Sequence, residues 1–128
     1  KPILEIKGIE FVSLQKDFGR EQIKSNNFEN LITDYYDKID KKPFEDTVSI
    51  INSLDMVICV CTSIAHISAT MKKNTWIIIP YVPDFRWGLK NSTTSWYKNV
   101  KLFRQKRIND WTEIIEEIKK ALIKKYIN

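Results

Sequence analysis

The sequence predicts an α/β domain with a mostly parallel β-sheet that is covered by helices on both faces. Short runs rich in apolar residues alternate along the chain with amphipathic stretches, which is typical of strands that alternate with helices. The chain of 128 residues also lacks internal repeats and Pro/Gly-rich linkers. We therefore expect one domain over residues 1–128.

The first half of the chain contains two predicted strands and two predicted helices. Residues 11–14 predict a buried strand, and a polar turn over residues 17–20 leads to a short helix from Glu21. Residues 31–34 predict a second short strand. Asp46 is expected to cap the next helix. The buried face of that helix is predicted to carry Val48, Ile51 and Leu54.

The same alternation continues in the middle of the chain. Residues 56–60 form an apolar run rich in β-branched side chains, which predicts a strand. Thr62 or Ser63 can then cap a helix that runs to about residue 72. Residues 76–79 predict another buried strand.

The chain ends with a predicted strand over residues 101–104 and a long helix. Asp110 and Glu113 have the spacing of a capping box, in which two side chains satisfy backbone N–H groups at a helix start. The predicted buried stripe of the helix consists of Trp111, Ile114, Ile115, Ile118, Leu122 and Tyr126.

The net charge of +5 does not indicate nucleic-acid binding. Residues 101–128 hold eight basic and four acidic residues and so carry +4 of this charge. On the predicted C-terminal helix the acidic residues come first and the lysines last, which is the order that complements the helix dipole. No apolar run approaches the roughly 20 residues needed to cross a bilayer. We therefore expect a cytoplasmic domain that neither spans a membrane nor binds nucleic acid.

The cysteine and histidine content does not favour a metal site. Cys59 and Cys61 lie two residues apart in an apolar run, so on a strand they share a face without disulfide geometry. Buried free thiols are the expected state. Because His66 is the only histidine and there is no further cysteine, we expect neither a metal nor a bound cofactor.

The turn after residues 56–60 is the most informative place for chemistry, because ligands of parallel α/β sheets bind beyond the carboxyl ends of the strands. A helix that starts at Thr62 and Ser63 offers unpaired backbone N–H groups and a positive dipole end to a phosphate. His66, about one turn later, can donate to a phosphate or a sugar. The alternative is structural, with a capping hydroxyl followed by a buried histidine. The chain has three glycines and no G-x-G-x-x-G fingerprint.

A second candidate is the loop of about twenty residues that follows residues 76–79. Loops of this length inside compact domains are generally functional or disordered. Its aromatic residues, Trp87 among them, can stack on a base or sugar, and Arg86 can bind an anion. The alternative is a loop that packs on its own rings or on a neighbouring domain.

Seven segments follow one another in an order that matches a known family. They are Val12-Ser13-Leu14-Gln15, Phe44-Glu45-Asp46-Thr47, Leu54-Asp55-Met56-Val57-Ile58, Thr62-Ser63-Ile64-Ala65-His66-Ile67, Pro80-Tyr81-Val82-Pro83-Asp84-Phe85-Arg86-Trp87, Ser95-Trp96-Tyr97 and Leu102-Phe103-Arg104-Gln105. Together they resemble the C-terminal glycosyltransferase domain of many bacterial tetratricopeptide-repeat proteins, which is related to the heptosyltransferases. The resemblance covers most of the chain.

This resemblance implies a Rossmann-like three-layer domain that forms one lobe of a GT-B glycosyltransferase and holds a nucleotide sugar as its donor substrate. In related enzymes the diphosphate lies on the turn that matches Thr62 and Ser63, with the counterpart of His66 close by. The region from Gln15 to Glu21 is then expected near the nucleoside or the sugar.

The resemblance also implies a partner. The acceptor surface and the catalytic base normally belong to an N-terminal lobe, which these residues do not contain. We therefore expect the isolated domain to bind the donor without transferring sugar to a glycan or protein acceptor. The expected partner is that lobe, or a repeat domain, of the same protein.

The chain departs from the family pattern at two places. Cys61 stands where the family usually has aspartate, and Lys72-Lys73-Asn74 replaces a Gly-Lys-Pro turn. Exchange of aspartate for cysteine removes a charge and an acceptor at the mouth of the expected donor site. The departures support an alternative function, a non-catalytic binding or interaction module that kept the fold.

Overall fold

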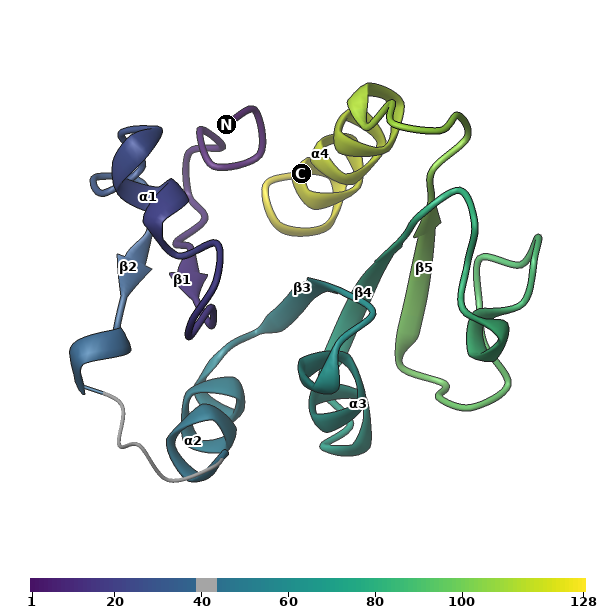
Figure 1. Cartoon of the computed structure of the whole chain (residues 1–128), viewed down its shortest axis with the longest axis horizontal. Helices are drawn as coiled ribbons and strands as arrows, with labels where there is room; N and C mark the ends of the chain where they lie inside the picture. Colours follow the sequence, from purple (N-terminus) through teal and green to yellow (C-terminus); the bar gives the residue numbers. More distant parts are fainter. Residues whose placement is uncertain (39–43) are drawn as a thin grey trace.

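The computed structural model describes residues 1–38 and 44–128 and shows a mixed α/β structure. All ladders between its strands are parallel, as expected. The strands form two small sheets, ordered β1-β2 and β3-β4-β5, in place of the single sheet that we predicted (Figure 1). Their bounds are β1 (Val12–Ser13), β2 (Thr33–Asp34), β3 (Met56–Val60), β4 (Asn74–Ile79) and β5 (Val100–Arg104).

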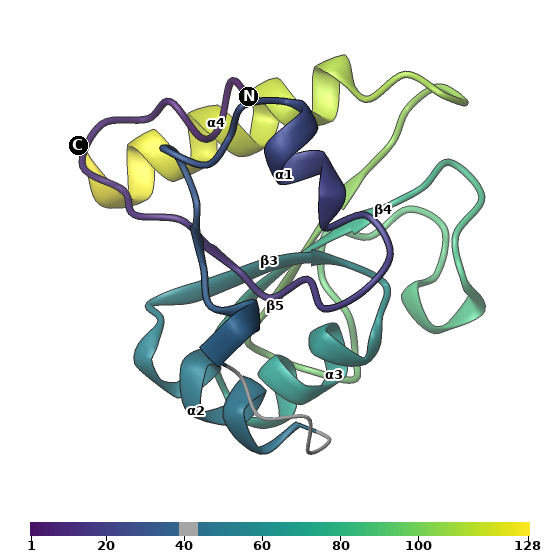
Figure 2. The ribbon, with the colours of Figure 1, turned by 60° about the vertical axis from the view of Figure 1, so that its left-hand side comes forward.

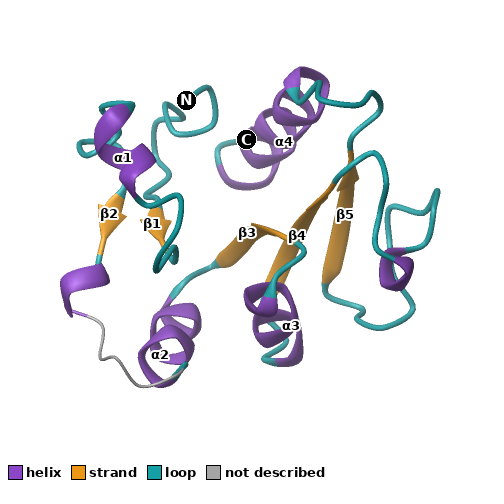
Figure 3. Cartoon of the chain, in the orientation of Figure 1, coloured by secondary structure: helices purple, strands orange, loops and turns teal. Residues whose placement is uncertain are grey.

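Helices alternate with these strands along the chain (Figure 3). The α-helices are α1 (Glu21–Ser25), α2 (Glu45–Ser53), α3 (Ser63–Thr70) and α4 (Thr112–Tyr126), with short 3-10 helices η1 (Tyr36–Lys38) and η2 (Phe85–Trp87). Within the described part of the chain, no helix combines the length and apolar character that a membrane span needs.

The sheet β3-β4-β5 is the middle of three layers. Ile77 and Ile79 of β4 pack in one buried cluster with Ala65 of α3, whereas Trp76 packs in another with Ile118 of α4. Because successive side chains of a strand point to opposite faces, one strand can supply both clusters. The apolar run of β4 is therefore explained by burial on both sides.

The helices are distributed over the two faces in the manner of a doubly wound fold. In two views, α1 and α4 lie on one side of the strands, and α2 and α3 on the other (Figures 1 and 2). Helices placed on opposite faces mean that the winding direction reverses between β1 and β3. The gap between the two sheets falls at this reversal.

The N-terminal elements differ from the prediction. Only Val12–Ser13 forms strand β1, and residues 11–14 are half-buried and not buried as predicted, because all four border a cavity. Asp46 lies in the first turn of α2 and does not occupy the N-cap, which is Phe44 with a φ of 68°. Val48 is 38% exposed, because Thr47 and Ile51 are the residues that α2 buries.

The predicted capping box before α4 does not form, because Trp111 and not Asp110 occupies the N-cap, and no side chain caps the helix. Asp110 Oδ1 accepts a hydrogen bond from the backbone N–H of Thr112 at 3.0 Å, and hydrogen bonding to Thr112 lowers the pKa of this carboxyl group. Glu113 does not complete the reciprocal bond and forms an ion pair with Lys106 at 3.0 Å.

The buried stripe of α4 is confirmed at Ile114, Ile118 and Leu122. Trp111 and Tyr126, at the two ends of the stripe, are 42% and 39% exposed because burial is confined to the middle of the helix.

The packing of α4 predicts that Ile118→Ala lowers the free energy of unfolding by about 2–5 kcal/mol, since Ile118 is fully buried between helix and sheet. The exposed neighbour Lys120, changed to alanine, should alter it by about 0.5 kcal/mol or less. Urea unfolding followed by circular dichroism measures both. Equal effects of the two substitutions would show that α4 is not part of the core.

Candidate functional site

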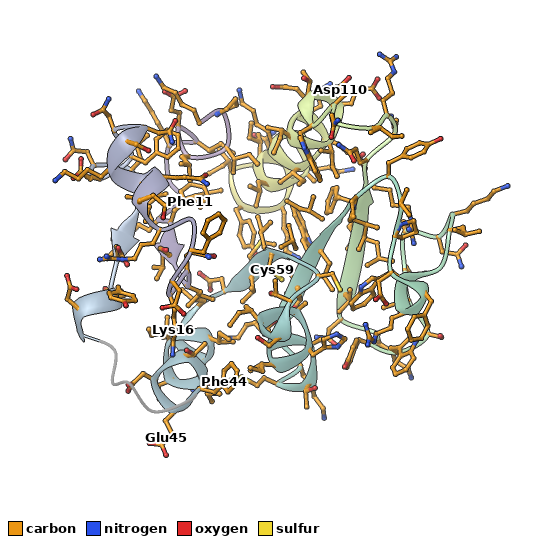
Figure 4. The ribbon with its side chains drawn as sticks, in the orientation of Figure 1. Phe11, Lys16, Phe44, Glu45, Cys59 and Asp110 are labelled. Carbon is orange, nitrogen blue, oxygen red and sulfur yellow. The ribbon has the colours of Figure 1, made fainter. Side chains whose placement is uncertain are left out.

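A cavity of about 880 Å³ lies between the two sheets. It is lined by residues 8–15, around β1, and by residues 53–60, around β3. Figure 4 labels Phe11 and Cys59, which line it from these two segments. β1 and β3 are each the last strand of their sheet on this side, so no ladder joins them across the cavity among the described residues.

Two of the predicted site residues meet at this cavity. Gln15 follows β1, Thr62 follows β3, and both line its wall. Ligands of open α/β folds bind beyond the carboxyl ends of the strands where the winding reverses. The cavity therefore opens at the position that the topology favours for a ligand.

The start of α3 is exposed and is not closed by a side-chain cap. Thr62 occupies the N-cap position, but its hydroxyl does not reach the helix, and its closest contact is a long bond of 3.5 Å to the carbonyl of Val60. The prediction that Thr62 or Ser63 caps the helix is therefore wrong, because Thr62 turns back toward the strand. Both hydroxyl side chains are exposed. The first N–H groups of α3, at Ser63 and Ile64, have no partner among the described hydrogen bonds.

His66 and Trp87 are brought together in a cluster of rings. The two rings stack with centroids 5.4 Å apart, and Nδ1 of His66 lies 3.1 Å from the hydroxyl of Tyr97. Trp87 is 2% exposed, and its indole N–H donates to Sγ of Cys61 at 2.9 Å. The cluster fastens the long loop to the helix start. A contact between the donor and His66 or Trp87 stays a prediction.

Arg86 lies next to this cluster and is engaged locally. Its Nη1 donates to Oδ2 of Asp84 at 2.9 Å, and its guanidinium carbon lies 4.9 Å from the ring centroid of Phe85. The 3-10 helix η2 explains this arrangement, because Asp84 caps its start by accepting from the Arg86 backbone N–H. Arg86 is half-buried. It must leave or share this ion pair to bind a phosphate.

Gln15 and Glu21 both bind backbone groups of the segment between β1 and α1. The side-chain amide of Gln15 donates to the carbonyl of Phe18, and Oε2 of Glu21 accepts from the N–H of Gly19 at 2.9 Å. Gly19 has a φ of 93°, which favours glycine and allows this tight turn. The two predicted residues therefore shape the same loop, and Gln15 reaches the cavity.

Sequence reasoning missed the residue that anchors the long loop. Arg104, at the end of β5, donates to the carbonyls of Trp87, Gly88 and Asn91. Partial burial lowers the pKa of Arg104. The contacts join residues 13 to 17 positions apart, and no local pattern in the sequence signals them. The same holds for the bond between His66 and Tyr97.

The two cysteines are free, as predicted, but both are half-buried and not buried, because Cys59 lines the cavity and Cys61 follows the end of β3. Burial raises the pKa of the Cys59 thiol to about 12, and the nearby Cys61 adds to the shift. Cys61 is bonded to Trp87. Among residues 1–38 and 44–128, no three His, Cys, Asp or Glu side chains gather as ligands for a metal ion.

Comparison with known proteins does not identify a relative: no family model, no curated protein and no solved structure matches the chain. The resemblance drawn from the seven segments therefore stays a prediction. Function is therefore inferred from the geometry of the cavity, the helix start and the ring cluster.

The burial of Cys59 predicts slow thiol labelling. At pH 8, the Cys59 thiol of a Cys61→Ser variant should react with a disulfide reagent at least about a hundredfold more slowly in the folded protein than in urea, because the thiolate is the reactive form. The rate in the folded protein should keep rising with pH above 8, because burial, the larger cause of the raised pKa, remains in this variant. The Cys59→Ser variant provides the control for Cys61. Equal rates for Cys59 in the folded and unfolded chains would contradict the burial.

Proposed function

We propose that residues 1–128 form the donor-binding lobe of a glycosyltransferase of the GT-B type. The nucleotide sugar binds in the cavity between β1 and β3, with its diphosphate at the start of α3. The observation that carries this proposal is the exposed, uncapped N-terminus of α3 beside a cavity at the reversal of the winding.

The charge distribution around the cavity supports an anion at this end. The first turn of α3 presents free N–H groups and the positive end of the helix dipole. The carboxylates that line the cavity, Glu10 and Asp55, precede β1 and β3 and so belong to the other ends of these strands. A diphosphate at Thr62 and Ser63 therefore avoids both carboxylates.

The remaining wall suits a nucleoside. Apolar side chains line the cavity from both sheets, with Phe11 and Leu14 on one side and Ile58 and Val60 on the other. A volume of about 880 Å³ lies within the range of sites for small ligands. The Gln15 amide adds a polar group at the carboxyl end of β1, where it can bind a base or a sugar hydroxyl.

Catalysis requires a second component. A general base must lie within hydrogen-bond reach of the acceptor hydroxyl, and the acceptor must be aligned with the anomeric carbon of the donor. His66 already shares a hydrogen bond through Nδ1 with Tyr97 and stacks on Trp87, so it suits donor binding better than proton abstraction. The base and the acceptor surface are expected from another lobe or subunit.

One observation favours a second candidate function, a binding module without catalysis. In the family that the seven segments resemble, aspartate usually stands at the position of Cys61, whose sulfur here accepts the indole N–H of Trp87. This contact is packed and neutral, and neither Cys61 nor Trp87 lines the cavity. Such a module would keep the fold and the loop but would no longer bind a nucleotide.

The donor site predicts that nucleoside diphosphates bind and raise the melting temperature. A ligand at a hundredfold excess over its Kd stabilises the folded state by about 2.7 kcal/mol. Ser63→Glu should weaken this binding at least about tenfold, because a carboxylate then occupies the phosphate position, although an acidic residue in the first turn stabilises a helix. Isothermal titration with uridine, adenosine, guanosine and thymidine diphosphates measures the affinity.

The matched control for this experiment is Ser63→Gln, because glutamine has nearly the same size as glutamate but carries no charge. It should retain affinity within about threefold, since the proposed contacts are made by backbone N–H groups. If neither variant changes the affinity, the diphosphate does not bind at α3. If no diphosphate binds the unaltered domain at millimolar concentration, the module without catalysis is favoured.

The role of His66 can be separated from that of its ring cluster. If His66 contacts the donor, His66→Ala should weaken binding about tenfold; it should also lower the free energy of unfolding by about 1–2 kcal/mol, because it removes the stacking on Trp87, while the free domain still folds. Tyr97→Phe removes the hydroxyl at 3.1 Å from Nδ1 and keeps the ring, so it tests the hydrogen bond alone. Loss of folding in His66→Ala would instead assign His66 to the framework.

A further inference from the structure

A second hollow lies at the opposite ends of the strands. Its volume is about 480 Å³, and it borders Asn74 and Val100, the first residues of β4 and β5. The C-terminal end of α4 lies on the side where β3 starts, away from the start of α3 (Figure 2). Four lysines line the hollow, which are Lys98, Lys101, Lys124 and Lys125.

None of these lysines is neutralised by a carboxylate. No ion pair involves any of them within the described ranges. On α4, Lys120 and Ala121 precede Lys124 and Lys125 by one helical turn, so the helix supplies no acidic neighbour. Like charges held around one hollow repel each other, and a bound anion relieves that repulsion.

The helix dipole accounts for only part of this cluster. Lys124 and Lys125 lie in the last turn of α4, where cations are favoured. Lys98 and Lys101 come from a different segment, at the start of β5, and the dipole of α4 does not explain why they line the same hollow.

Aromatic rings fix the position of one of the charges. Nζ of Lys101 lies 4.6 Å from the ring centroid of Phe103 and 5.5 Å from that of Trp76. Trp76 is buried and also borders the hollow. A cation held over two rings is positioned before a ligand arrives, which reduces the entropy lost on binding.

We propose that this hollow is a binding site for a compact ligand with two or more phosphate groups. Lysine binds phosphate as a point charge, and four such charges suit several phosphates at once. The charges border a shallow, open hollow of about 480 Å³, whose small size favours a small polyanion over the extended surface of a duplex or a membrane. The hollow is separate from the start of α3, so this proposal does not depend on the proposed donor site.

Titration calorimetry with inorganic tripolyphosphate tests this site. The double variant Lys98→Gln/Lys124→Gln should weaken binding at least about tenfold, because it removes one charge from each side of the hollow. The matched control is Lys90→Gln/Lys120→Gln, which removes two exposed lysines, one from the loop and one from α4, that do not line the hollow. The control should change the affinity by less than about twofold. Repeating the titration in the Ser63→Glu background excludes binding at α3.

Three results would overturn the proposal. Absence of binding, or equal weakening in the two double variants, would show that the lysines act only as diffuse surface charge. If a short DNA duplex binds through Lys98 and Lys124 and tripolyphosphate does not displace it, the ligand is a nucleic acid and not a compact phosphate.

Discussion

The rest of the structure depends on the burial of β4 on both of its faces. Ile77 and Ile79 pack toward α3, and Trp76 packs toward α4. Because β4 pairs with both β3 and β5, its position sets where each of these strands ends and hence where the turn into α3 emerges. The position of the candidate site at Thr62 therefore depends on β4, although Thr62 itself follows β3.

Strands β1 and β2 stand apart from the sheet that contains β4. The N-terminal segment is attached to the core through Ile6, which packs in the cluster of α4, and no described backbone bond joins β1 to β3. Side-chain packing thus holds the two halves together where a ladder would otherwise run. The consequence is a cavity at the reversal of the winding, and this cavity is the main support for a ligand in the proposed function.

Local patterns predicted the strands from residue 56 onward and the buried side of α4, because burial on one or two faces leaves a periodic trace in the sequence. They failed where the outcome depends on distant partners. Thr62 turns toward Val60 and not toward the helix, and His66 meets a tyrosine 31 positions away. The division into two sheets was also not predicted, since the apolar run at residues 11–14 does not show which other strand it pairs with.

The central claim, a diphosphate at the start of α3, is tested most directly by backbone amide chemical shifts. Titration of the ¹⁵N-labelled domain with a nucleoside diphosphate should shift the amides of Ser63, Ile64 and Ala65 most strongly, together with that of Gln15 across the cavity. The amides of Thr112 and Glu113, at the start of α4, line neither the cavity nor the lysine hollow and serve as the reference. Shifts confined to those two, or no shifts at the start of α3, would contradict the account.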